Sequence, residues 1–195
     1  MSSETQWCNV GSNVDYSSGM AWVNPTNIQG STNDNVYATV TSPFGGSSLH
    51  SDHLNANFPV FSTTGTITSV TIAFEVKRNS GITSNSPRLY IYNSTDGWCA
   101  GHDVSPFGTT ESTRSAVCTH HSWTYSKLDS IQTRCTILNF NASAGGRLYA
   151  DRAWAIANIY VAPTGYGNDV NGVASANIAE INGVATANIS EVNGA

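Results

Sequence analysis

The sequence predicts an all-β protein: an antiparallel β-sandwich of the jelly-roll type, followed by an extended C-terminal repeat tail. Only 11% of the residues are charged and 17 are glycine, and Ser, Thr and Asn are abundant, which is typical of β proteins. Short apolar or alternating segments recur between turn signals at intervals of roughly 10 to 15 residues. No segment shows the period of an amphipathic helix. A sandwich satisfies all three observations.

The expected organisation has three parts. Residues 1–21 are polar and glycine-rich without a clean period, so we expect an N-terminal arm. Residues 22–162 form the sandwich domain. Residues 163–195 hold a hinge, from Pro163 to Asn168, and the repeat tail. A chain of 195 residues is long enough for one domain with a good core and a small appendage.

The first expected strands run from Asp34 to Val40 and from Leu54 to Phe61, the second interrupted by Pro59. Thr66 to Arg78 is the clearest strand, because alternate residues are apolar (Val70, Ile72, Phe74 and Val76). Ile67 is out of phase with this set. A bulge near Thr68-Ser69 would return it to the core.

Later strands are expected at residues 87–93, 131–140 and 153–161. The last is apolar on both faces, which predicts a central strand covered on both sides. Residues 93–130 are too many for a simple connection. We expect a short strand there, from Arg114 to Cys118, together with exposed functional surface.

The tail repeats an 11-residue unit: residues 170–180 are followed by 181–191, and a third copy begins at Val192. Each copy has an Asn-Gly pair next to a β-branched residue. Glycine inside a helix would cost about 1 kcal/mol per repeat, which argues against a helix of this period. We therefore expect short extended pieces joined by turns at Asn171-Gly172, Asn182-Gly183 and Asn193-Gly194. A disordered low-complexity tail is the alternative.

So short a unit cannot bury an apolar edge by itself and must lie along sister copies or a partner. The tail is therefore predicted to dock or to oligomerise by adding strands to a sheet edge. The residues expected to make this contact are Asn171, Gly172, Val173, Ile178, Ile181, Asn182, Gly183, Val184, Ile189 and Val192.

Charge and motifs exclude several functions. The formal net charge is −5, and the eight basic residues are scattered apart from Lys77-Arg78, so we expect no nucleic-acid partner. No apolar run could span a membrane. The first residues lack the features of a signal peptide, which predicts folding in a cytosol. No catalytic motif is present, and we expect neither enzymatic activity nor a cofactor.

The four cysteines could be free thiols or form up to two disulfides. Cys135 lies in an apolar run and is expected to be a core thiol. Cys8, Cys99 and Cys118 lie in polar surroundings, where oxidation could link loops or subunits. We expect no metal. The alternative is a zinc site of Cys99, His102, Cys118 and His120. In the simpler interpretation the histidines are exposed in a loop, or a Cys99–Cys118 disulfide closes that loop.

Aromatic residues in expected loops suggest a second function class. Trp98, Trp123, Tyr125 and Tyr166 could stack on sugar rings, as in a carbohydrate-binding β-sandwich. In the alternative interpretation, Trp98 and Trp123 cap one end of the sandwich.

Several motifs occur in a recognisable succession. They are Trp22-Val23-Asn24-Pro25, Asp34 to Ala38, Leu54 to Phe61, Thr66 to Ile72 and Ala150 to Ile156. This succession resembles the jelly-roll-like modules in structural proteins of tailed bacteriophage virions. The Asn-Gly-Val-Ala-x-Ala-Asn-Ile repeats look like tail segments of such proteins. The resemblance covers residues 22–161 and the tail, whereas the segment 98–123 has no match in it.

The resemblance implies a non-enzymatic virion structural protein of the decoration, collar, tail-fibre or spike type. Such a protein would assemble in the cytoplasm of a bacterial host and reside in the virion. Its partners would be itself, commonly as a homotrimer, and other virion proteins. A glycan of the host surface is the further partner that the loop aromatics suggest.

Overall fold

The computed structural model describes residues 2–16, 19–62, 64–98, 101–119 and 122–161, and the backbone of 180–181 and 184–185. The chain divides into two units, residues 1–160 and residues 161–195. No helix among the described residues is long and apolar enough to cross a membrane.

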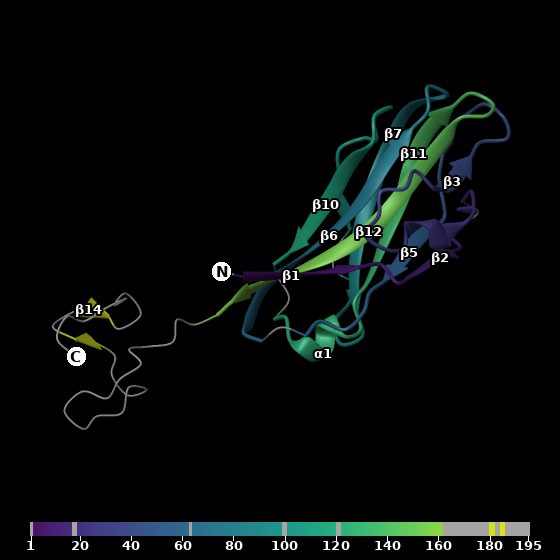
Figure 1. Ribbon diagram of the computed structural model, residues 1–195. Coiled ribbons are helices and arrows are strands. Elements are labelled where there is room, and N and C mark those ends of the chain that lie inside the picture. Colours follow the sequence, from purple (N-terminus) through teal and green to yellow (C-terminus); the bar gives the residue numbers. More distant parts are fainter. Residues whose placement is uncertain are drawn as a thin grey trace. The chain divides into compact units, whose positions relative to one another are not determined.

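Two antiparallel sheets form the first unit (Figure 1). Sheet A has the order β1 (Ser2–Trp7), β12 (Arg147–Tyr160), β6 (Thr66–Arg78) and β10 (Ser112–Cys118), and β3 (Ala38–Thr41) also pairs with β12. Sheet B has the order β2 (Val10–Val14), β5 (His53–Asn57), β11 (Gln132–Ala142), β7 (Ile82–Asn93) and β8 (Gly97–Trp98). On sheet B, β4 (Gly46–Leu49) pairs with β11, and β9 (His102–Asp103) pairs with β7. The helical segments are η1 (Pro25–Ile28) and α1 (Tyr125–Leu128). The predicted antiparallel β-sandwich is confirmed.

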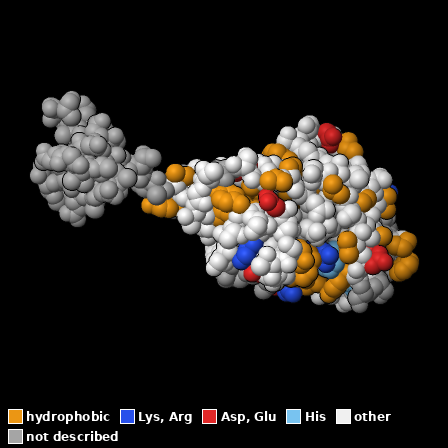
Figure 2. Space-filling model, turned by 90° about the horizontal axis from the view of Figure 1, so that it is seen from below, with side chains coloured by type: hydrophobic (Ala, Val, Ile, Leu, Met, Phe, Trp, Pro, Cys, Tyr) orange, Lys and Arg blue, Asp and Glu red, His pale blue; other side chains and the backbone are white. Residues whose placement is uncertain are grey.

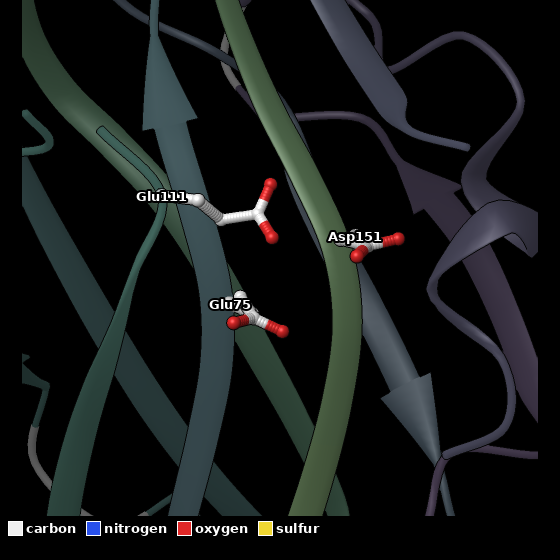
Figure 3. A group of neighbouring side chains, drawn as sticks. All are labelled: Glu75, Glu111 and Asp151. Atoms are coloured by element: carbon white, nitrogen blue, oxygen red, sulfur yellow. The ribbon is translucent and has the colours of Figure 1, made fainter. Parts of the chain in front are cut away.

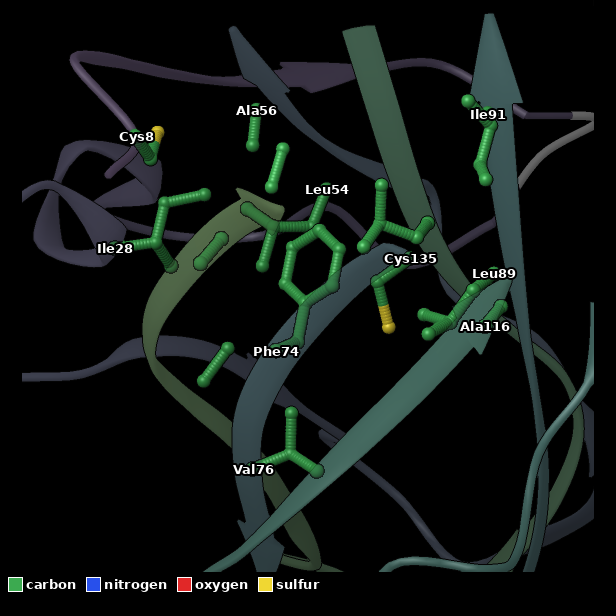
Figure 4. Packing of buried hydrophobic residues seen from close by; sticks show 14 of the residues in the cluster. Cys8, Ile28, Leu54, Ala56, Phe74, Val76, Leu89, Ile91, Ala116 and Cys135 are labelled. Atoms are coloured by element: carbon green, nitrogen blue, oxygen red, sulfur yellow. The ribbon is translucent and has the colours of Figure 1, made fainter. Parts of the chain in front are cut away.

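The core fills the space between the two sheets. Phe74 and Val76 of β6 point toward the side chains of sheet B, where Leu54 belongs to β5 and Leu89 to β7 (Figure 4). All four side chains are at most 1% exposed. Because side chains alternate along a strand, burial of these positions places their neighbours on the outer faces.

Strand β6 has the bounds and the bulge that the sequence predicts. Asn158 of β12 lies opposite Ser69, and Ile159 lies opposite Ile67, so Thr68 is the extra residue. Because of the extra residue, Ile67 points to the same face as Val70 and is only 7% exposed.

Strand β12 is central, as predicted, but only one of its faces is fully buried. It lies between β6 on one side and β1 and β3 on the other. Ala153, Ala155 and Ala157 are completely buried, whereas Trp154 and Ile156 on the opposite face are partly exposed. The prediction of a strand covered on both faces was therefore wrong, because aromatic and aliphatic side chains also occupy the outer face.

The predicted N-terminal arm is instead part of the sandwich. Residues 2–7 pair with β12, and residues 10–14 pair with β5. The chain passes from sheet A to sheet B at Cys8, whose amide donates to the Ala153 carbonyl at 2.9 Å. Strand β1 lies at a sheet edge, and its side chains are either exposed or half-buried. Backbone pairing rather than side-chain burial holds it, so no hydrophobic pattern reveals it.

In the second unit, the backbone pairs where the second copy of the repeat begins. Strand β13 (Glu180–Ile181) is antiparallel to β14 (Val184–Ala185), with Ile181 opposite Val184. The predicted turn at Asn182-Gly183 lies between these strands but outside the described residues, so it stays a prediction. The remaining contact residues lie outside the described part of the chain: Asn171, Gly172, Val173, Ile178, Asn182, Gly183, Ile189 and Val192.

Candidate functional site

The outer face of sheet B carries aromatic side chains beside polar ones. Leu54 and Ala56 of β5 point into the core, as do Leu89 and Ile91 of β7, so the residues between them face outward. The strand register places Asn55, Arg134 and Tyr90 side by side on β5, β11 and β7. In the same way it places Asn57, Gln132 and Tyr92 side by side.

The aromatic side chains form a continuous series across this face. The ring of Tyr16 lies 4.6 Å from that of His53, and His53 lies 5.7 Å from Tyr90. Trp98 of β8 then lies 6.2 Å from Tyr90 and 4.8 Å from Tyr92. We call Tyr16, His53, Tyr90, Tyr92 and Trp98 the aromatic row. Trp98 is 39% exposed, which leaves ring surface open to a ligand.

Arg134 connects the aromatic row to the polar residues. The carbon at the centre of its guanidinium lies 4.1 Å from the Trp98 ring centroid, a cation–π contact. Burial lowers the pKa of Arg134 from its usual value, although a guanidinium stays protonated at neutral pH. The side chain thus offers several N–H donors next to an exposed indole.

Three polar atoms beneath this face have no hydrogen-bond partner. They are Nδ1 of His53, Oδ1 of Asn55 and Nε of Arg134, all of them buried. Burial, followed by the positive charge of Arg134, lowers the pKa of His53 to about 4, so its imidazole is neutral at neutral pH. Buried polar groups in proteins nearly always find a partner, so these atoms can pair with water or with ligand hydroxyls if a covering ring shifts.

One side of the aromatic row is bounded by Gly101 and a groove. A β-carbon on Gly101 would lie 2.6 Å from Cε1 of Tyr90, so the backbone itself lies against that ring. The groove continues along β7 and includes Arg88, Asp103 and Leu138 in its lining. Arg88 and Asp103 form an ion pair with a nitrogen to oxygen distance of 2.6 Å.

Among the described aromatic residues that were predicted to contact a glycan, Trp98 is the one that lies in this row. Trp123 is 6% exposed, and its indole nitrogen donates to the Cys118 carbonyl at 3.2 Å, so its ring cannot stack on a sugar in this structure. Tyr125, in α1, donates to the Gly65 carbonyl at 3.1 Å and is outside the row. Tyr166 lies outside the described residues.

The sequence alone does not single out Tyr90 and Tyr92, because the glycan prediction rests on aromatic residues in loops and these two lie in the strand expected at residues 87–93. The signal was present: they alternate with Leu89 and Ile91, which are fully buried. An aromatic residue at each outward position of a strand marks an open aromatic surface. Asn55, Gln132 and Arg134 become recognisable only through the pairing of strands distant in sequence.

The surroundings of two cysteines differ from the prediction. Cys8 and Cys118, expected in polar surroundings, are 2% and 0% exposed and belong to the core. Cys8 is a free thiol whose pKa burial raises to about 12, so it is poorly reactive toward oxidants. Cys135 is a buried free thiol, as predicted. Cys99 lies outside the described residues, and a Cys99–Cys118 disulfide stays a prediction.

The alternative zinc site is divided between the two sheets. His102 belongs to β9 on sheet B, whereas Cys118 ends β10 on sheet A. Cys99 and His120 lie outside the described residues. Among the described residues, the possible metal ligands that lie close together are three carboxylates on sheet A.

No family model matches the chain, and no curated protein matches it. Among solved structures, a family 29 carbohydrate-binding module from Piromyces equi aligns with 82% of this chain and 93% of its own, at 10% identity and a TM-score of 0.39. The xylan-binding module CBM15 aligns with 80% of this chain and 93% of its own, at 13% identity and a TM-score of 0.38. The enzymatically active domain of tailspike protein 4 from bacteriophage CBA120 aligns with 78% of this chain and 19% of its own, at 12% identity and a TM-score of 0.35. At TM-scores below 0.5, these likenesses establish neither a family nor a function.

Proposed function

We propose that the chain is a carbohydrate-binding β-sandwich protein and that the glycan lies on the outer face of sheet B. The observation that carries this proposal is the aromatic row, with Trp98 exposed and in ring contact with Tyr90 and Tyr92. This is the alternative that the loop aromatics suggested, and it is supported by a set of residues that shares Trp98 with the predicted one.

The chemistry of the face suits a sugar. A pyranose ring has an apolar C–H surface, which packs on an aromatic ring, and a rim of hydroxyls that need donors and acceptors. Gln132 and Asn57 offer amides beside Tyr92, and Arg134 offers N–H groups beside Trp98. Only 11% of the residues are charged, and Figure 2 shows one face of the molecule on which charged side chains are few among uncharged and hydrophobic ones. So low a charge favours a ligand rich in hydroxyls over a polyelectrolyte.

Binding without catalysis is the second part of the proposal. The described polar groups along the aromatic row are amides, tyrosine hydroxyls, a guanidinium and an imidazole, whereas glycoside hydrolysis commonly requires two carboxyl groups facing the bond to be cleaved. Asp52, near the row, is already engaged: it accepts from the Asn13 amide and from the Tyr16 backbone, each at 3.0 Å.

We further propose that the glycan-binding domain belongs to a virion component that assembles through its tail. The support is the sequence resemblance to phage structural proteins, the repeated unit and the paired backbone at residues 180–181 and 184–185. In this proposal the glycan is one of the host surface, and homotrimerisation through the repeats multiplies a modest affinity per site.

A glycan array probed with the full-length protein tests the binding proposal. We expect wild-type protein to bind a defined set of oligosaccharides. Replacing Trp98 with Ala should weaken that binding about fivefold or more, since a stacked ring contributes on the order of 1 kcal/mol. Calorimetry with a soluble oligosaccharide from the array measures the loss.

Phe44→Ala is the matched control, because Phe44 is exposed to 64% but lies away from the row, between β3 and β4. This variant should bind as the wild type does. The proposal fails if the wild type binds no glycan, or if Trp98→Ala and Phe44→Ala bind alike.

A further inference from the structure

Three carboxylates come together on neighbouring strands of sheet A, away from the aromatic row. Glu75 lies on β6, Glu111 directly precedes β10, and Asp151 lies on β12. One oxygen of each carboxylate lies within 4.8 Å of the others. Figure 3 shows Glu111 extending across β6 toward the strand that carries Asp151.

Asp151 occupies this position because of a second bulge. Ala150 pairs with Val76 and Arg152 pairs with Glu75, so Asp151 is an extra residue in β12. Bulges commonly redirect a side chain at functional places. Without the bulge, the alternation of β12 would shift by one residue.

The two oxygens of Asp151 are buried and have no hydrogen-bond partner, and the residue is 1% exposed. An ionised carboxylate in such a place is costly unless a cation or donors compensate it. Burial, followed by the negative charges of Glu111, Asp34 and Glu75, raises the pKa of Asp151 to about 6. Arg152 acts in the opposite direction, but among the described residues no group donates a hydrogen bond to either oxygen.

The other two carboxylates are already bound by side chains. Glu75 pairs with Arg152, and Glu111 accepts from the Tyr37 hydroxyl at 2.7 Å and pairs with Lys77 at 3.4 Å. With Asp34 and Asp151, the group has two more carboxylates than cationic side chains. A divalent cation would neutralise this excess.

The spacing indicates which cation fits. Calcium binds oxygen at about 2.3–2.6 Å, so two ligands on opposite sides of one ion can lie about 5 Å apart. Magnesium, at about 2.0–2.1 Å, draws its ligands closer than about 4.2 Å. A limit of 4.8 Å on the distances between the three oxygens lies within the span of one calcium ion, whose shell water would complete, and exceeds the span of magnesium.

We propose that Glu75, Glu111 and Asp151 form a calcium site that fastens β10, β6 and β12 of sheet A to one another. Because a bound ion stabilises only the folded state, calcium raises the melting temperature. At a calcium concentration about a hundred times the Kd, the rise should be about 5 °C or more.

The test compares thermal unfolding in EDTA and in millimolar calcium, for the full-length protein and for Asp151→Asn. Calcium should raise the melting temperature of the wild type by about 5 °C or more and should leave that of Asp151→Asn unchanged. Asp151→Asn should be at least as stable as the wild type in EDTA, because the substitution removes a buried, uncompensated charge. Asp129→Asn, at an exposed position after α1, is the matched control and should respond as the wild type does.

Terbium supplies a second measurement that does not depend on stability. Tyr37 donates to Glu111, so its ring is close enough to transfer excitation energy to a bound lanthanide. We expect terbium emission on excitation of tyrosine, competed by calcium and absent in Asp151→Asn. The proposal is overturned if calcium changes neither the melting temperature nor the emission of the wild type, or if Asp151→Asn and Asp129→Asn respond equally.

Discussion

At the scale of single residues, His53 shows how a side chain on an outer face becomes buried. It is 8% exposed because the Tyr16 ring packs on it at 4.6 Å and the Tyr90 ring lies 5.7 Å away in an edge-on contact. Asp52 raises the pKa of the imidazole and Arg134 lowers it, but burial dominates and brings it to about 4. His53 is therefore neutral in the folded protein at pH values where the unfolded chain already binds a proton.

This difference predicts a loss of stability in mild acid. The folded-state pKa is below the unfolded value of about 6.5, so stability is retained above pH 6.5 and lost as the pH falls toward 4. Between pH 7 and pH 4.5, the wild type should lose roughly 2 kcal/mol more free energy of unfolding than His53→Gln, which cannot titrate. Urea denaturation of both proteins at the two pH values measures it. Equal losses would show that His53 is not the responsible group.

At the scale of secondary-structure elements, the sequence predicts what alternation determines. Strand β6 has the expected bounds, and its bulge follows from Ile67 being out of phase with Val70. Strands β7, β11 and β12 begin several residues earlier or end later than predicted, because backbone pairing continues where the side chains are polar. The candidate site was only partly predictable, since Tyr90 and Arg134 become neighbours through the pairing of β7 with β11.

The N-terminal strand supplies the prediction at this scale. Strand β1 pairs with residues 154–159 of β12, and the Trp7 ring lies 5.2 Å from that of Trp154. Deleting residues 1–7 should lower the melting temperature and promote association, because it exposes part of an edge of β12. Trp7→Ala in the full chain removes only the ring contact and should cost less, on the order of 1 kcal/mol. If the deletion mutant has the same melting temperature as the full chain, residues 1–7 are better described as an arm.

At the scale of the whole molecule, the two units correspond to two proposed tasks. The sandwich holds the aromatic row and the carboxylate cluster, on different sheets. Residues 161–195 form a unit of their own, with the repeats. Recognition and assembly should therefore be separable by cutting the chain between the units.

Deletion of residues 162–195 tests this separation. The shortened protein should keep the melting temperature of the sandwich and its affinity for a soluble oligosaccharide, because every described residue of the aromatic row remains. On a surface dense in the same glycan, it should bind about 100-fold more weakly than the full chain, because binding through several linked sites would be lost. Light scattering should show an oligomer for the full chain and a monomer for the shortened one. Trp98→Ala should give the opposite result, an intact oligomer that binds neither ligand well. If the full chain is itself a monomer, or if the shortened protein binds the dense surface equally well, the repeats do not assemble the molecule.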